Sequence, residues 1–213
     1  MPAELTRLFG VVCGQLPAHT WSPGHVLLPM CQRCTGLYAG AAVALLLHAG
    51  LRLRPSERFL WLHGGFLLQM VPLGYQWVPQ DALLRTLSGI LFGAGVTSFL
   101  WLTTGPRIAA THAPDRTGWL VYVTGLACAL ALVPAAAIWG DSRAWYALVI
   151  LATLGLAGLG FLALGNIVLG SMWLLRRAAP LLRRAVTPAP RDIPASAAVR
   201  PAPRRPRGAS RPR

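Results

Sequence analysis

The sequence predicts an all-α polytopic membrane protein, and two observations carry that prediction. Of the 213 residues, 54% are hydrophobic and only 12% are charged, which is about half the charged fraction of a typical soluble domain. Five apolar stretches approach the roughly 20 residues that a membrane-spanning helix needs, and arginines and helix breakers fall between them. The expected spans are therefore 35–51, 59–78, 84–104, 118–139 and 145–173.

Residues 1–34 come before the first span and hold three of the four cysteines. The apolar run LFGVVCGQLP after Arg7 is too short for the hydrophobic core of a secretory signal peptide. We therefore expect this segment to be retained, and to form an extracytoplasmic cap that bears cysteine and histidine side chains.

The first three spans are expected to form a membrane core over residues 35–104. Gly36 and Gly40 in the first span, and Gly89 and Gly93 in the third, are each four positions apart. This spacing puts two small residues on one face of a helix and allows a neighbouring helix to approach closely. We expect the first and third spans to use these faces for packing.

Residues 105–175 supply two further transmembrane helices, and the following segment, 176–213, is rich in arginine, proline and alanine. It holds eleven of the twenty arginines and only one acidic residue, Asp192. Such a segment is typical of a disordered cytoplasmic tail that contacts anionic lipid headgroups. It lacks the interleaved aromatic residues and the folded base-recognition motif of a nucleic-acid-binding domain. The expected partner is therefore the lipid bilayer and not a nucleic acid.

The distribution of arginine predicts the orientation of the spans. With the N-terminus outside, sixteen arginines lie on the inner side of the membrane and four on the outer side. Cytoplasmic loops carry the excess of positive charge in membrane proteins. We therefore expect an N-out, C-in arrangement, in which Cys13, Cys31 and Cys34 lie outside.

The stretch LLPMCQRCTGLYAG places Cys31 and Cys34 at the start of the first span. Two cysteines separated by two residues can direct both sulfurs at one tetrahedral metal ion. Cys13 supplies a third sulfur, and His19 and His25 are the candidates for a fourth ligand. This combination of ligand types favours zinc as the cofactor.

The same cysteines are consistent with two other kinds of chemistry. Cys31 and Cys34 can cycle between a dithiol and a disulfide, with Arg33 stabilising a thiolate and Cys13 acting as the resolving thiol. An oxidising compartment also permits a purely structural disulfide. Cys128 is different, because it lies mid-span, where we expect a buried thiol that behaves as a small apolar residue.

Three blocks of the sequence stand out together: CGQLPAHTW, LPMCQRCTGLYAG and PLGYQWVPQDALLRTLSGILFGAG. They resemble the DUF2085 family of predicted prokaryotic membrane proteins, over residues from about 10 to 95. The elements shared with the family pattern are Cys13, Pro17, Pro29, Cys31, Arg33, Cys34, Thr35, Gly36, Tyr38, Gly40, Gln76, Arg85, Gly89 and Gly93.

This chain departs from the family pattern beside the first cysteine. Gly14 stands where the family has a histidine, and His19 stands where the family has an arginine. If the family histidine is a metal ligand, His19 or His25 has to replace it here. The resemblance implies a multi-pass protein of the prokaryotic plasma membrane and a site, but it implies no reaction.

The resemblance also indicates four further candidate site residues, Arg33, Tyr38, Gln76 and Arg85. In the N-out arrangement Gln76 and Arg85 fall near the outer membrane face, as the cysteines do. Asp81 lies four residues before Arg85, which allows an ion pair on one face of a helix.

Polar residues within the spans suggest little catalytic machinery. His48 and His63 lie near inner helix ends, where we expect them to meet headgroups. No acidic residue lies at an expected mid-membrane position, and no hydrolase, metalloprotease or nucleotide-binding motif is found. Catalysis is therefore not indicated, and a small-solute permease would need a path among His63, Gln69 and Asn166.

The interpretation we favour is an integral membrane protein with an extracytoplasmic Cys/His zinc site, either structural or metal-handling. The main alternative is a membrane thiol–disulfide oxidoreductase that uses Cys31 and Cys34. A small-solute permease is a second alternative.

Overall fold

The computed structural model describes residues 3–186, with side chains described for residues 4–179. All regular elements in this part are helical, which confirms the predicted fold class. The chain divides into two compact units, Met1–Met172 and Trp173–Arg213. The elements, with 3-10 helices written as η, are α1 (Ala3–Gly10), η1 (Pro17–His19), η2 (Pro23–His25), α2 (Gln32–Gly50), α3 (Glu57–Leu68), α4 (Met70–Gly74), α5 (Ala82–Ile108), α6 (Arg116–Trp139) and α7 (Ser142–Val186).

Three helices of the described part are long and apolar enough to cross a membrane. They are Ala82–Ile108, Arg116–Trp139 and Ser142–Ala179, and each contains one of the expected spans. The transmembrane character of the chain is thereby confirmed. The count of five spans and the N-out orientation stay predictions.

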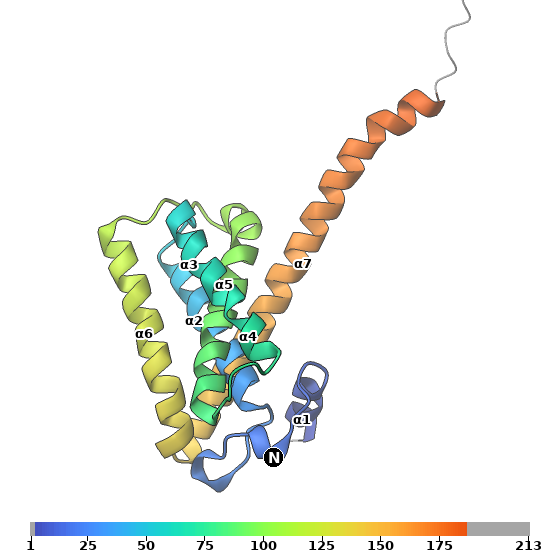
Figure 1. Cartoon of the computed structure of the whole chain (residues 1–213). Coiled ribbons are helices and arrows are strands. Elements are labelled where there is room, and N and C mark those ends of the chain that lie inside the picture. Colours follow the sequence, from blue (N-terminus) through green and yellow to red (C-terminus); the bar gives the residue numbers. More distant parts are fainter. Residues whose placement is uncertain (1–2, 187–213) are drawn as a thin grey trace, which may run out of the picture. The chain divides into compact units, whose positions relative to one another are not determined.

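Helices α2 and α5 run alongside each other at the centre of the first unit (Figure 1). A Cβ atom at Gly36 would lie 2.1 Å from the carbonyl oxygen of Thr86. A Cβ atom at Gly93 would lie 2.0 Å from the carbonyl oxygen of Leu37. Only glycine fits at such separations, so the two backbones touch directly. The expected close approach of the first and third spans is confirmed.

The segment expected as the second span, 59–78, is helical but divided. Helices α3 and α4 are separated by Gln69, which keeps helical dihedral angles (φ −56°, ψ −25°). Pro72 has no N–H to donate to the carbonyl four residues earlier, so the hydrogen-bond ladder is interrupted here. The side-chain amide of Gln69 instead donates to the carbonyl oxygen of Ser88 in α5, at 3.0 Å.

Two aspartates determine where α5 and α6 begin. The carboxylate of Asp81 accepts a hydrogen bond from the backbone N–H of Leu84, at 2.7 Å. The carboxylate of Asp115 accepts one from the backbone N–H of Gly118, also at 2.7 Å. Each carboxylate satisfies a helix N–H that has no partner within the helix. Charged residues between apolar stretches therefore act as helix caps here.

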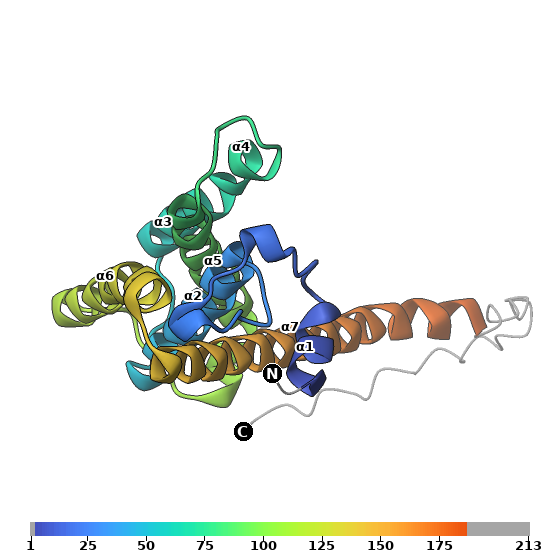
Figure 2. The same cartoon turned by 90° about the horizontal axis from the view of Figure 1, so that it is seen from below.

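The N-terminal segment packs against the helix ends at which α2, α5 and α7 begin (Figure 2). The indole N–H of Trp21 donates to the hydroxyl of Thr86 at 2.9 Å. The indole N–H of Trp145 donates to the carbonyl oxygen of Leu27 at 3.0 Å. These bonds link the segment to two different helices.

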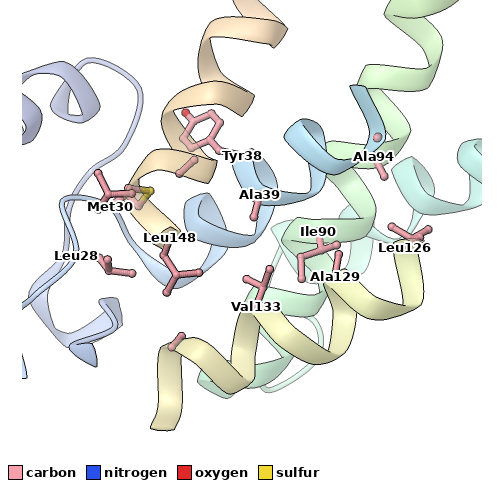
Figure 3. Close-up of a cluster of buried hydrophobic side chains, with 14 of the residues drawn as sticks. Leu28, Met30, Tyr38, Ala39, Ile90, Ala94, Leu126, Ala129, Val133 and Leu148 are labelled. Atoms are coloured by element: carbon pink, nitrogen blue, oxygen red, sulfur yellow. The ribbon is translucent and has the colours of Figure 1, made fainter. Parts of the chain in front are cut away.

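A hydrophobic core lies behind this segment and is shared by α2, α5, α6 and α7. Figure 3 shows side chains from all of these elements meeting in it: Leu28, Met30, Tyr38, Ala39, Ile90, Ala129, Val133 and Leu148. The segment contributes its own apolar residues to this core. Its fold therefore depends on the helices beneath it.

The two histidines expected to meet lipid headgroups are fully buried, so that expectation is wrong. His48 Nε2 lies 2.9 Å from the hydroxyl of Ser98. His63 Nδ1 lies 2.7 Å from the carbonyl oxygen of Phe59, and its Nε2 lies 2.7 Å from the hydroxyl of Tyr122. Because a carbonyl only accepts, His63 carries its proton on Nδ1 and accepts the Tyr122 hydroxyl at Nε2.

The three polar residues considered for a solute path each form a hydrogen bond with a neighbouring helix. The side-chain amide of Asn166 donates to the carbonyl oxygen of Leu100 and to the hydroxyl of Thr104, both at 2.9 Å. Gln69 contacts α5 and His63 contacts α6. Polar side chains of this kind hold membrane helices together.

Helix α7 runs without a break to Val186, so the glycines in its middle do not interrupt it. The first residues of the predicted tail are therefore helical, up to Val186. In the second unit, the guanidinium of Arg177 lies 4.2 Å from the centre of the Trp173 ring. The rest of the predicted tail, 187–213, and its expected contact with lipid headgroups lie outside the described residues.

Candidate metal centre

The sulfur atoms of Cys13, Cys31 and Cys34 all lie within 4.8 Å of one another. Cys13 is buried in the loop after α1, Cys31 immediately precedes α2, and Cys34 lies in the first turn of α2. The structure therefore brings together three of the five residues predicted as metal ligands. All three are free thiols.

The start of α2 explains the relative position of two of these thiols. Cys31 has extended dihedral angles (φ −72°, ψ 164°) and serves as the N-cap residue of α2. Its carbonyl oxygen accepts hydrogen bonds from the backbone N–H of Thr35 at 2.8 Å and from the Thr35 hydroxyl at 3.0 Å. One helical turn then brings Cys34 to the same side as Cys31. The positive end of the helix dipole also stabilises a thiolate.

The third thiol is held in place by backbone and side-chain hydrogen bonds. The sulfur of Cys13 accepts from the backbone N–H of Cys31 at 3.3 Å and from that of Gln15 at 3.5 Å. The side-chain amide of Gln15 donates to the carbonyl oxygens of Thr6 and Pro29, at 2.6 and 2.8 Å. Gln15 thus connects α1 to the irregular stretch before Cys31.

The three thiols have unequal acidities. A hydrogen bond from the Cys34 thiol lowers the pKa of Cys31 to about 5, against the opposing effect of burial. The same hydrogen bond, together with burial, raises the pKa of Cys34. One thiolate is therefore stabilised within the cluster, which suits either metal binding or nucleophilic attack.

Neither predicted histidine joins the group of ligand atoms among the described residues. His19 lies in η1 and lines a pocket that Cys31 also lines. His25 lies in η2 and is exposed, with a left-handed backbone conformation (φ 62°). A role for either histidine as the fourth ligand stays a prediction.

The cluster borders a pocket of about 480 Å³. Three of the four further candidate residues, Arg33, Gln76 and Arg85, line this pocket. The fourth, Tyr38, is buried in the hydrophobic core, with its ring centre 5.9 Å from that of Phe9. Tyr38 therefore supports the helix that carries the cysteines and does not line the pocket.

Glutamine side chains position the pocket arginines. The Nη2 atom of Arg33 donates to the side-chain oxygen of Gln80, and it also lies 3.3 Å from the carbonyl oxygen of Leu73. The Nη1 atom of Arg85 lies 3.4 Å from the side-chain oxygen of Gln32. Sequence reasoning missed these glutamines and Gln15, because a single polar residue in a loop or at the start of a helix leaves no periodic signal.

Two expectations about single residues are corrected by the structure. The carboxylate of Asp81 caps α5, and no ion pair with Arg85 is found among the described residues. Cys128 is not buried but exposed on α6. Its surroundings are therefore quite unlike those of the clustered thiols.

A family model described as a predicted membrane protein (DUF2085) matches this chain. Residues 13–99 match DUF2085. The DUF2085 match begins at Cys13 and runs into α5, so it includes all three clustered thiols and every residue that lines the pocket. Helices α6 and α7 lie outside the DUF2085 match. No curated protein and no solved structure matches the chain significantly.

Proposed function

We propose that the protein binds one zinc ion through Cys13, Cys31 and Cys34, on the outer face of a prokaryotic plasma membrane. The proximity of the three sulfurs, within 4.8 Å of one another, carries this proposal. At a Zn–S distance of about 2.3 Å, the sulfurs of a tetrahedral site lie about 3.8 Å apart, which a small adjustment provides. The N–H groups directed at the Cys13 sulfur would also stabilise a metal-bound thiolate.

The fourth ligand decides what kind of zinc centre this is. A fourth protein ligand makes a closed structural site, whereas water in that position makes a site that can exchange metal or bind a further ligand. His19 is the first candidate because it shares a pocket with Cys31. His25 is the second. The double variant His19→Ala/His25→Ala loses zinc if a histidine closes a structural site, and keeps it if the fourth position holds water.

The outer location is supported by the arginine distribution and by the directions of the helices. The loop before α5 returns to the cysteine end, since Gln80 contacts Arg33. The chain returns there again after α6, where the backbone N–H of Gly24 donates to the carbonyl oxygen of Gly140 at 3.0 Å. A chain that returns repeatedly to the same end agrees with five spans that cross the membrane in alternating directions. The positive-inside rule then puts the cysteine end outside.

The metal content of the detergent-purified protein tests the proposal. Mass spectrometry should find about one zinc per chain in the wild type and none in the double variant Cys31→Ser/Cys34→Ser. Cys128→Ser is the matched control, since this thiol is exposed on α6 and distant in sequence from the cluster. It should keep the zinc. Equal zinc in all three proteins, or none in the wild type, would contradict the proposal.

Thiol–disulfide exchange is the second candidate function. It is favoured by the position of Cys31, which lines the pocket while two other sulfurs lie within 4.8 Å. A zinc centre protects its thiols from alkylation until a chelator is added. A redox pair is protected by a disulfide instead, and then reductant exposes the thiols while chelator has no effect.

A further inference from the structure

We propose that the pocket beside the cysteine cluster binds a phosphate group, and that it does so independently of the metal. The phosphate is presented either by a lipid headgroup or by a free phosphate compound. The pocket is lined by His19, Cys31, Arg33, Gln76, Val78, Pro79, Gln80 and Arg85. None of these lining residues carries a carboxylate, and the charges of Arg33 and Arg85 exceed that of a Cys31 thiolate, so the net charge of the lining is positive.

The two arginines come from different helices and have no carboxylate partner in the described part of the chain. Arg33 extends from α2, where its guanidinium is held by Gln80 and Leu73. Its Nε atom is buried and makes no hydrogen bond to any described residue. A buried N–H without a partner is costly, and an acceptor bound in the pocket would satisfy it.

Arg85 extends from α5 and is only weakly engaged. Among the described residues, its side chain contacts only Gln32, at 3.4 Å, which is long for a hydrogen bond to a guanidinium. The nearby carboxylate of Asp81 is used as a helix cap. Arg85 therefore keeps donors for a ligand, and guanidinium groups match the geometry of phosphate oxygens.

The positive charge of the two arginines exceeds the negative charge that a zinc–thiolate centre would carry. This charge balance rests on the proposed function: with zinc bound, three thiolates and one divalent ion would carry a net charge of −1. Arg33 and Arg85 together carry +2, which leaves one positive charge for a bound anion. The volume of about 480 Å³ lies within the range of small-molecule sites.

The surroundings of the pocket indicate why a lipid is one of the two sources. Trp77 and Tyr75 lie in the loop that supplies Gln76, and their side chains are 70% and 73% exposed. Exposed Trp and Tyr side chains are typical of the headgroup level of a membrane. A lipid phosphate lies at that level, whereas a free phosphate compound would enter from the aqueous side.

Binding measurements on the full-length protein test this proposal. In a non-ionic detergent, inorganic phosphate is titrated by calorimetry. In parallel, native mass spectrometry counts the lipids retained from mixed micelles of phosphatidylglycerol and phosphatidylcholine. The variants are Arg33→Gln and Arg85→Gln, and the control is Arg143→Gln, an exposed arginine at the start of α7 that does not line the pocket.

Either pocket variant should weaken binding by about tenfold or more, because each removes a charge-assisted hydrogen bond. Arg143→Gln should bind as the wild type does. Titratable inorganic phosphate identifies a free phosphate compound as the source, and retained phosphatidylglycerol identifies a lipid. If neither probe binds, or if Arg143→Gln reduces binding as much as Arg85→Gln does, the proposal is overturned.

The double variant Cys31→Ser/Cys34→Ser separates this proposal from the zinc proposal. It should bind the phosphate probe at least as tightly as the wild type, because the negative thiolates are gone while both arginines remain. Loss of the probe in this variant, at a thermal unfolding midpoint equal to that of the chelator-treated wild type, would show that the metal and not the arginines holds the anion.

Discussion

The indole N–H of Trp21 donates a hydrogen bond to the hydroxyl of Thr86 over 2.9 Å, which joins the cysteine-bearing segment to α5. Thr86 is fully buried, and its hydroxyl donates in turn to the carbonyl oxygen of Ala82 at 2.9 Å. Trp21 lies in the loop between Cys13 and Cys31. This contact is therefore one of those that hold the loop between the first thiol and the other two.

Replacing Trp21 by Phe should loosen the cysteine cluster. The change removes one buried hydrogen bond, which is worth about 1 kcal/mol, and leaves the Thr86 hydroxyl with one contact fewer. We expect faster alkylation of the clustered thiols in the zinc-loaded protein. Trp77→Phe is the control, because that indole is 70% exposed. Equal alkylation rates in the two variants would argue against a structural role for the Trp21 contact.

Replacing Gly93 by Ala should strongly destabilise the protein. The added methyl group would lie 2.0 Å from the carbonyl oxygen of Leu37 and would force α2 and α5 apart. Overpacking of this kind costs about 1–3 kcal/mol or more. Gly64→Ala in α3 is the control, since no atom lies within 4 Å of the added methyl group. Thermal unfolding in detergent should show a lower midpoint for Gly93→Ala and an equal or higher one for Gly64→Ala.

Replacing Tyr122 by Phe should lower the stability of the protein, because it removes the hydrogen-bond partner of the buried His63. Without the hydroxyl, Nε2 of the fully buried His63 loses its partner, which costs about 1–3 kcal/mol. Tyr146→Phe removes a hydroxyl from a side chain that is 63% exposed and should change little. Unfolding midpoints measure the difference. A midpoint for Tyr122→Phe as high as that of Tyr146→Phe would mean that the hydrogen bond contributes nothing.

The acidity of Cys31 predicts a pH dependence in the metal-free protein. The pKa of Cys31 in the folded protein is lowered from 9.0 to about 5. A lowered pKa stabilises the folded state above the ordinary pKa, so this stabilisation declines as the pH falls from 9 and is lost near 5. At pH 6, iodoacetamide should therefore label the wild type rapidly at Cys31. The variant Cys34→Ala lacks the hydrogen bond that lowers this pKa and should be labelled more slowly.

Removal of zinc should lower the stability of the wild type but not of the cluster variant. A ligand that binds only the folded state stabilises it by mass action, by about 2.7 kcal/mol at a hundredfold excess over Kd. We expect a chelator to lower the unfolding midpoint of the wild type. Cys31→Ser/Cys34→Ser should unfold at one midpoint with and without chelator. A chelator effect of equal size in both proteins would assign the effect to another metal site.

Local patterns in the sequence predicted those parts of the fold that depend on local spacing. The four-residue glycine spacing predicted the α2–α5 contact, because spacing alone determines which side chains share a helix face. The spacing of Cys31 and Cys34 predicted that their sulfurs converge, and the family pattern connected Cys13 to them. Arg33 and Arg85 were found in the same way and now line one pocket.

Features that depend on tertiary contacts were not predicted from the sequence. His48 and His63 lie near helix ends in the sequence, yet a covering helix, α6, supplies Tyr122 and takes one of them out of contact with lipid. Gln15 joins three backbone segments, and no pattern in its own neighbourhood indicates this. The second span divides at Gln69 because Pro72 interrupts the hydrogen-bond ladder, while the apolar run around it continues without a break.

The glycine contact between α2 and α5 has a consequence for permeation. Added methyl groups would lie between 2.0 and 2.3 Å from backbone oxygens at four positions along it: Gly36, Gly40, Gly89 and Gly93. A space that admits no methyl group admits no water molecule or hydrated ion. This seam is therefore sealed immediately behind the cysteine cluster, and the contents of the pocket cannot pass between α2 and α5.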